Sequence, residues 1–192
     1  MKVACVTEGE TEYVCVPKIV GRLGHVVISN VHAGGCVDDW DLTFERKILP
    51  YVKTAALKSP DKILIVVDRE KRPLCCGGLA SRALQILSVG LTAENLTASL
   101  SLVISDRKFE SIIMADYELM DRLPILSRSV SPDFGIVLDG TDPKAVVDRA
   151  LKPGKKYDKV RHGGALASSM RLEDLTVQSR SRSLRKLLKE LT

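Results

Sequence analysis

The chain has 192 residues, of which 45% are hydrophobic, 28% are charged and only 4% are aromatic. This length and composition predict one globular domain and exclude a disordered chain, a collagen-like repeat and a disulfide scaffold. No apolar run approaches the ~20 residues that cross a bilayer, and the N-terminus has no signal-peptide pattern. We therefore expect a soluble, cytoplasmic protein with no membrane partner.

Five cysteines are present, an odd number that includes the adjacent pair Cys75 and Cys76. A disulfide between neighbours would be strained, so we expect free thiols in a reducing compartment, with the adjacent pair filling the core. No two cysteines have the spacing of a structural zinc site, and the three histidines add none.

Hydrophobic patterns typical of strands and helices alternate along the first two thirds of the chain. Buried strands are expected at residues 2–7, 26–31, 62–67 and 100–104. Helices are expected at residues 11–23, 40–57, 77–87 and 109–119. The alternation predicts an α/β fold with a central, mostly parallel sheet that is flanked by helices.

Charge is spread unevenly along the sequence. Residues 1–151 contain 18 basic and 20 acidic residues, whereas residues 152–192 contain 11 basic and 4 acidic ones. We expect a single domain with an acidic α/β core over residues 1–123 and a basic, mainly helical C-terminal extension over residues 124–192. Helices in this extension are expected at residues 142–151 and 178–191. The basic segment is either a solvated helical surface or a contact surface for a polyanion.

Carboxylates follow three of the expected strands, at the edge where ligands bind in open α/β sheets. Glu8 ends the first strand, and Glu12 lies one helical turn later. Asp68 and Glu70 end the third strand with period-two spacing, and Glu110 follows the fourth. Carboxylate oxygens are the ligands of hard divalent cations, so the pattern predicts a site for Mg²⁺ (or Mn²⁺).

Two of these segments resemble a known family. Residues 8–12 read EGxTE after a hydrophobic strand, and residues 68–70 end another strand with a D-x-D-like pair about sixty residues later. Together they resemble the Toprim domain of topoisomerases, primases and the overcoming-lysogenization-defect nucleases. Residues 109–116 and 162–164 are similar to a small prokaryotic Toprim-like branch, some members of which occur near antiphage genes.

The resemblance implies a Rossmann-like fold and a Mg²⁺-dependent nuclease or related phosphodiesterase. It implies that Glu8 is the catalytic general acid/base or a metal-facing glutamate. By the same resemblance Glu12, Asp68 and Glu70 bind the metal. Glu110 is then either a further ligand or a group that orients the substrate. Because Glu70 stands where the family pattern has an aspartate, the number of metal ions stays open.

A nuclease of low sequence specificity binds DNA or RNA through phosphates. The few aromatic residues also favour recognition of the backbone over base stacking. The basic candidates for nucleic-acid binding are Lys152, Lys155, Lys156, Lys159, Arg161, Arg180 and Arg182. Dependence on an ATPase or another protein partner, and a role in antiphage defence, are hypotheses that accompany the resemblance.

Two other classes of function stay open. A catalytically silent Toprim-like module would bind nucleic acid or act as an interaction subunit, docking a partner through the amphipathic segment from Leu184 to Leu191. A Rossmann-type nucleotide-binding enzyme is disfavoured, because no G-x-G-x-x-G follows the first strand and no Walker motif is present.

Overall fold

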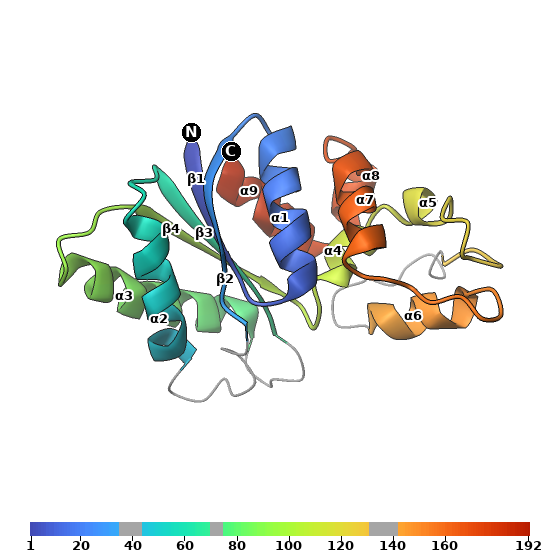
Figure 1. Cartoon of the computed structure of the whole chain (residues 1–192), viewed down its shortest axis with the longest axis horizontal. Coiled ribbons are helices and arrows are strands. Elements are labelled where there is room, and N and C mark those ends of the chain that lie inside the picture. Colours follow the sequence, from blue (N-terminus) through green and yellow to red (C-terminus); the bar gives the residue numbers. More distant parts are fainter. Residues whose placement is uncertain (35–43, 70–74, 131–141) are drawn as a thin grey trace.

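Four parallel strands form the central sheet in the order β2-β1-β3-β4 within the described residues (Figure 1). The computed structural model describes residues 1–34, 44–69, 75–130 and 142–192. The strands are β1 (Lys2–Thr7), β2 (Val26–His32), β3 (Lys62–Asp68) and β4 (Ser99–Ser105). Each lies within one residue of its predicted bounds, which confirms the expected α/β fold with a parallel sheet.

Helices cover both faces of the sheet. On one face α2 (Phe44–Ala56) and α3 (Cys76–Thr92) pack on alternate residues of β3, among them Ile63 and Ile65. The helices α1 (Glu10–Arg22) and α9 (Arg182–Leu191) cover the other face. Because both faces are covered, β3 is a continuous apolar run rather than an alternating one.

The strand order reverses between β1 and β3. The chain leaves β1 for β2 on one side and leaves β3 for β4 on the other, and all three strand pairs are parallel. Thr7 lies level with His32 and Val66, and Asp68 lies level with Ser105. The carboxyl ends of all four strands therefore meet at one edge, and the crevice at such a reversal is where open α/β sheets bind ligands.

Short helices follow β4 and extend the molecule to the right in Figure 1. They are α4 (Glu110–Met114), α5 (Tyr117–Met120), α6 (Pro143–Ala150), α7 (Arg161–Ser169) and α8 (Leu175–Ser179). The single helix predicted at 109–119 is divided, because Asp116 has a non-helical backbone (φ −100°, ψ 61°).

No helix was predicted where α7 lies, because Gly163 and Gly164 lower helix propensity. These glycines let α7 pack closely on α1. A Cβ at Gly164 would lie 2.9 Å from Val14 Cγ1. Tertiary packing has here outweighed local propensity.

The last helix, α9, belongs to the core of the sheet. Its Leu184, Leu187, Leu188 and Leu191 are all buried, each less than a tenth exposed. Glu190 on the same helix accepts a hydrogen bond from Ser101 Oγ of β4 at 2.6 Å. The hypothesis that this helix docks a partner through its leucines is therefore wrong, because the chain's own sheet already covers them.

The four described cysteines, Cys5, Cys15, Cys75 and Cys76, are free thiols as predicted, and Cys36 lies outside the described residues. Of the adjacent pair, Cys76 is partly buried and packs against the core, as predicted, whereas Cys75 is exposed and its Sγ accepts a hydrogen bond from the Gly78 N–H at the start of α3. In the part of the chain that the structure describes, no helix has both the length and the apolar character that a membrane span requires.

Candidate active site

Four of the five predicted carboxylates lie together at the carboxyl edge of the sheet. We call Glu8, Glu12, Asp68 and Glu110 the acidic cluster. Glu8 Oε2 accepts a hydrogen bond from the backbone N–H of Asp68 at 3.4 Å, and Glu12 shares a side-chain hydrogen bond with Asp68. The charge of Glu110 also acts on Glu12. The fifth carboxylate, Glu70, lies outside the described residues.

The alternation of β3 directs Asp68 into this cluster. Leu64 and Val66 pack in the core on the α1 side, and side chains two residues apart share a face, so Asp68 points to the same side. Glu110 begins α4 and is 8% exposed. Its Oε1 accepts a hydrogen bond from Thr11 Oγ1 of α1 at 3.4 Å.

Glu12 is the most deeply buried member of the cluster, with 3% of its surface exposed. It lies in the first turn of α1, and its carboxylate folds back over Gly9, the residue that caps the helix. Burial raises the pKa of Glu12 to about 7, and the charge of Glu110 adds to the rise. The hydrogen bonds with backbone and with Asp68, and the charge of Lys159, lower it by less. At neutral pH this carboxyl group therefore both holds and releases a proton.

Four buried hydroxyl groups have no hydrogen-bond partner among the described residues. They are Thr7 Oγ1, Ser105 Oγ, Ser111 Oγ and Tyr157 OH. Two of them belong to chain neighbours of Glu8 and Glu110, and a third belongs to the residue level with Asp68 in the sheet. Burial raises the pKa of Tyr157 and the charge of Glu110 raises it further, which places this phenol within the field of the cluster. Buried polar atoms of this kind are normally satisfied by water or an ion.

The donor set matches Mg²⁺ in its chemistry. Carboxylate and hydroxyl oxygens suit this ion, which keeps several waters and takes only one or two carboxylates from a protein. Across the described ranges, no group of three or more His, Cys, Asp and Glu side chains is arranged to hold a metal by itself. The residues thus fit a hydrated ion held by one or two carboxylates, with the hydroxyls bonded to its waters, rather than a closed cage of protein ligands.

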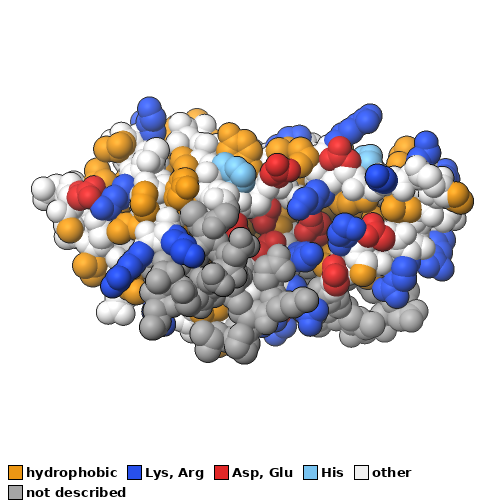
Figure 2. Space-filling view, turned by 60° about the horizontal axis from the view of Figure 1, so that its bottom comes forward, with side chains coloured by type: hydrophobic (Ala, Val, Ile, Leu, Met, Phe, Trp, Pro, Cys, Tyr) orange, Lys and Arg blue, Asp and Glu red, His pale blue; other side chains and the backbone are white. Residues whose placement is uncertain are grey.

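Two lysines act electrostatically on the cluster. Lys159 lowers the pKa of Glu12, which distinguishes it from the other lysines predicted to bind nucleic acid. The pKa of Lys144 on α6 is raised chiefly by Asp148 and also by Glu110. Figure 2 shows acidic side chains gathered in a hollow near the centre of this face, with Lys and Arg side chains beside them. Sequence reasoning missed Lys144, because only the fold brings α6 against α4.

The other basic residues that were predicted to bind nucleic acid differ in their surroundings. Lys155, Lys156 and Arg161 are exposed in the loop before α7 and at its start. Lys152 Nζ donates to the Pro124 carbonyl at 2.7 Å. Arg182 is the first residue of α9 and lies 3.5 Å from Asp106.

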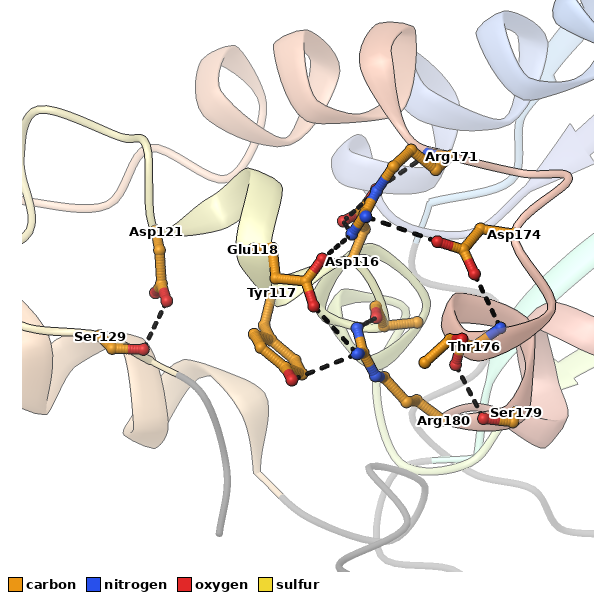
Figure 3. Close-up of polar contacts among 11 residues, drawn as sticks. Asp116, Tyr117, Glu118, Asp121, Ser129, Arg171, Asp174, Thr176, Ser179 and Arg180 are labelled. Carbon is orange, nitrogen blue, oxygen red and sulfur yellow. Dashed lines mark hydrogen bonds and ion pairs between the residues drawn. The ribbon is translucent and has the colours of Figure 1, made fainter. Parts of the chain in front are cut away.

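The side chain of Arg180 is engaged in contacts within the protein. Its side chain is 16% exposed, stacks over the Tyr117 ring at 4.0 Å and lies 3.1 Å from a Glu118 oxygen (Figure 3). It also donates to the Ala115 carbonyl at 3.1 Å. We therefore leave Arg180 out of the surface considered for nucleic acid.

The neighbouring Arg171 joins the same network. Its backbone N–H donates to Asp116 Oδ2 at 2.9 Å, and its guanidinium contacts both Asp116 and Glu118 (Figure 3). Burial raises the pKa of Asp116, but the hydrogen bonds and charge of Arg171 outweigh burial and hold it below its usual range. This network ties α5 to the segment before α8.

The chain was compared with protein-family models, with curated proteins and with solved structures. The resemblance to Toprim domains rests on residues 8–12 and 68–70, of which the structure describes all but Glu70. None of the family models, curated proteins or solved structures compared with the chain matches it.

Proposed function

We propose that the protein is a Mg²⁺-dependent phosphodiesterase of Toprim type that cleaves nucleic acid. One observation carries this proposal: four carboxylates converge where the strand order reverses between β1 and β3. In open α/β sheets this crevice is the ligand site. Burial raises the pKa of Glu12, and a bound cation would let the gathered carboxylates ionise together. Mg²⁺ is the hard cation that suits their oxygens.

Asp68 and Glu8, which follow adjacent strands, would hold the ion. When bound, Mg²⁺ supplies a Lewis acid for the scissile phosphate and lowers the pKa of attacking water. Glu12, with a pKa of about 7, is suited to hold or release a proton at its carboxylate near neutral pH. Of the two roles that the resemblance implies for Glu8, we therefore retain the metal-facing one.

The substrate would be recognised through its phosphates. Lys159 and Lys144 bring positive charge to the acidic cluster, where it would attract a phosphodiester and offset its repulsion by the carboxylates. Such contacts carry no base sequence, so we expect low sequence specificity.

The proposal is tested by calorimetric titration of Mg²⁺ and Mn²⁺ into the wild type and into Asp68→Asn and Glu8→Gln. The matched control is Glu94→Gln, which removes a half-exposed carboxylate paired with Lys53. The same samples are assayed for cleavage of single- and double-stranded DNA and RNA. We expect both site variants to lose metal binding and at least about 100-fold in cleavage rate, while the control keeps both.

Two results would count against the proposal. A wild type that binds no divalent cation rules out the metal site. A wild type that binds the ion but cleaves none of the four substrates contradicts the nuclease and favours a silent binding module.

A further inference from the structure

A groove of about 680 Å³ lies beside β4, between α3 and α9. Its apolar lining includes Leu84 and Ile104, and its basic lining comes from two separate parts of the chain, the end of β3 and the helix α9. The basic residues are Arg69, Arg182 and Lys186. Among the described lining residues, these three basic side chains accompany one acidic side chain, that of Asp106.

The groove lies at the same edge of the sheet as the acidic cluster, on the side that α3 covers. Arg69 directly follows Asp68, and its backbone N–H donates to the Ser105 carbonyl at 2.9 Å. Asp106 directly follows Ser105, which lies level with Asp68 in the sheet. Two residues that line the groove are thus the immediate chain neighbours of residues at the cluster's edge.

The basic groups are held toward the groove by defined contacts. Asp106 accepts a hydrogen bond from Arg69 Nε at 2.7 Å and lies 3.5 Å from the Arg182 guanidinium. Asp106 therefore contacts both arginines and links β3 to α9. Arg182 and Lys186 are four residues apart on α9, so they share one side of that helix. Their side chains are 67% and 48% exposed.

Lys186 also forms an ion pair with Glu190, which accepts the hydrogen bond from Ser101 as well. An ion pair that is this exposed contributes little energy in water, so its lysine can exchange the carboxylate for a phosphate at low cost.

We infer that this groove is a second phosphate-binding subsite, which holds the nucleic-acid backbone beyond the nucleotide at the acidic cluster. The inference rests on the proposed function and adds a footprint of several nucleotides to it. Lys144 and Lys159 act on the cluster from α6 and the loop before α7, whereas the groove is lined by α3, the end of β4 and the start of α9. In Figure 1, α3 and α6 lie on opposite sides of the sheet edge. Cations on both sides of the carboxylates fit a strand that runs across them, and the apolar lining offers contact for a sugar or base.

The test compares two double variants. Arg182→Gln with Lys186→Gln removes two charges from the groove. Lys58→Gln with Lys189→Gln removes two exposed charges that do not line it, one of them on the same helix. Binding of fluorescent single-stranded DNA of about 4 and about 16 nucleotides is measured by anisotropy in EDTA, from about 50 to about 200 mM salt.

Log affinity falls as log salt rises. For the longer strand, we expect the magnitude of this negative slope to be smaller by about 1 to 2 in the groove variant. The shorter strand, which does not span both regions, should bind the wild type and the groove variant alike. The control variant should match the wild type with both strands.

Equal losses in the two double variants would overturn the inference, because bulk charge would then explain the effect. So would an unchanged slope in the groove variant. Cleavage with Mg²⁺ is assayed on the same proteins. If the wild type cleaves nucleic acid but the groove variant keeps the salt dependence of the wild type, the subsite is refuted and the proposed function is not. A wild type that neither binds nor cleaves refutes both the subsite and the proposed function.

Discussion

The carboxylate of Glu12 occupies the space that a side chain at Gly9 would fill. A Cβ built on Gly9 would lie 3.0 Å from Glu12 Cδ and closer still to one carboxylate oxygen. Gly9 has an ordinary extended backbone, with φ −94°, so its role is to leave room rather than to adopt a special conformation. The glycine of the EGxTE segment therefore sets where the buried carboxylate lies.

Gly9→Ala should displace the Glu12 carboxylate and so disturb its hydrogen bond with Asp68, a proposed metal ligand. We therefore expect Mg²⁺ binding to weaken about 10-fold or more, with a stability cost of about 1 to 3 kcal/mol from overpacking. Calorimetry and urea unfolding measure the two effects. Gly21→Ala is the control: nothing lies within 4 Å of its added Cβ, and in a helix it should raise stability by about 0.5 to 1 kcal/mol. Equal metal affinity in both variants would contradict this role of Gly9.

The raised pKa of Glu12 predicts how the metal-free protein responds to pH. Its pKa rises from 4.5 to about 7 on folding, so the folded state binds this proton more tightly than the unfolded state. The stability that this proton provides is complete below about pH 4.5 and is lost as the pH rises through about 7. The shift corresponds to about 3 kcal/mol.

Glu12→Gln should abolish this loss. In EDTA, the stability of the variant relative to the wild type should rise by up to about 3 kcal/mol between about pH 5 and about pH 8, as measured by urea unfolding. A difference that does not change with pH would show that Glu12 is not a buried titrating group.

Much of the fold could be predicted because the signals are local. The apolar run before Asp68 identifies a buried strand by itself. The helical pattern after Glu8 places Glu12 in the first turn of α1, although Glu8 itself precedes the helix. The convergence of these residues follows from strands that are parallel, a property that the alternation of strands and helices already indicates.

The rest depends on contacts between distant segments. No local pattern shows that α7 forms across two glycines, since its close packing on α1 is what stabilises it. The amphipathic pattern of α9 indicates an apolar face but not what covers it. In the same way, the sequence alone indicates only a surface charge at Arg180, because its partners Glu118 and Tyr117 are distant in the sequence and meet it only in the fold.

The ion pair between Arg171 and Asp116 should be asymmetric in its contribution to stability. The Asp116 side chain is fully buried, whereas the Arg171 side chain is 44% exposed and also contacts Glu118. Arg171→Ala leaves a buried carboxylate without its partner and should cost about 3 kcal/mol. Asp116→Asn leaves an arginine that water can reach and should cost about 1 to 2 kcal/mol.

Urea unfolding near neutral pH measures both variants. Lys144→Ala, which breaks an exposed pair four residues apart, is the control and should change stability by less than about 0.5 kcal/mol. The pKa of Asp116 is lowered on folding, so its contribution is present at neutral pH and is lost as the medium becomes acid. If Asp116→Asn costs more than Arg171→Ala, the burial argument is wrong.

Lys159 should matter more than its neighbour Lys155. Both are exposed, but only the charge of Lys159 is among the effects that act on Glu12 within the described residues. Lys159→Gln should therefore lower kcat/KM for nucleic-acid cleavage about 10-fold at low salt, while Lys155→Gln changes it by much less. A second measurement is independent of cleavage: without Lys159 the pKa of Glu12 rises, so the pH at which the metal-free protein loses stability should move upward. Equal effects of the two lysines in both measurements would mean that Lys159 acts only as general surface charge.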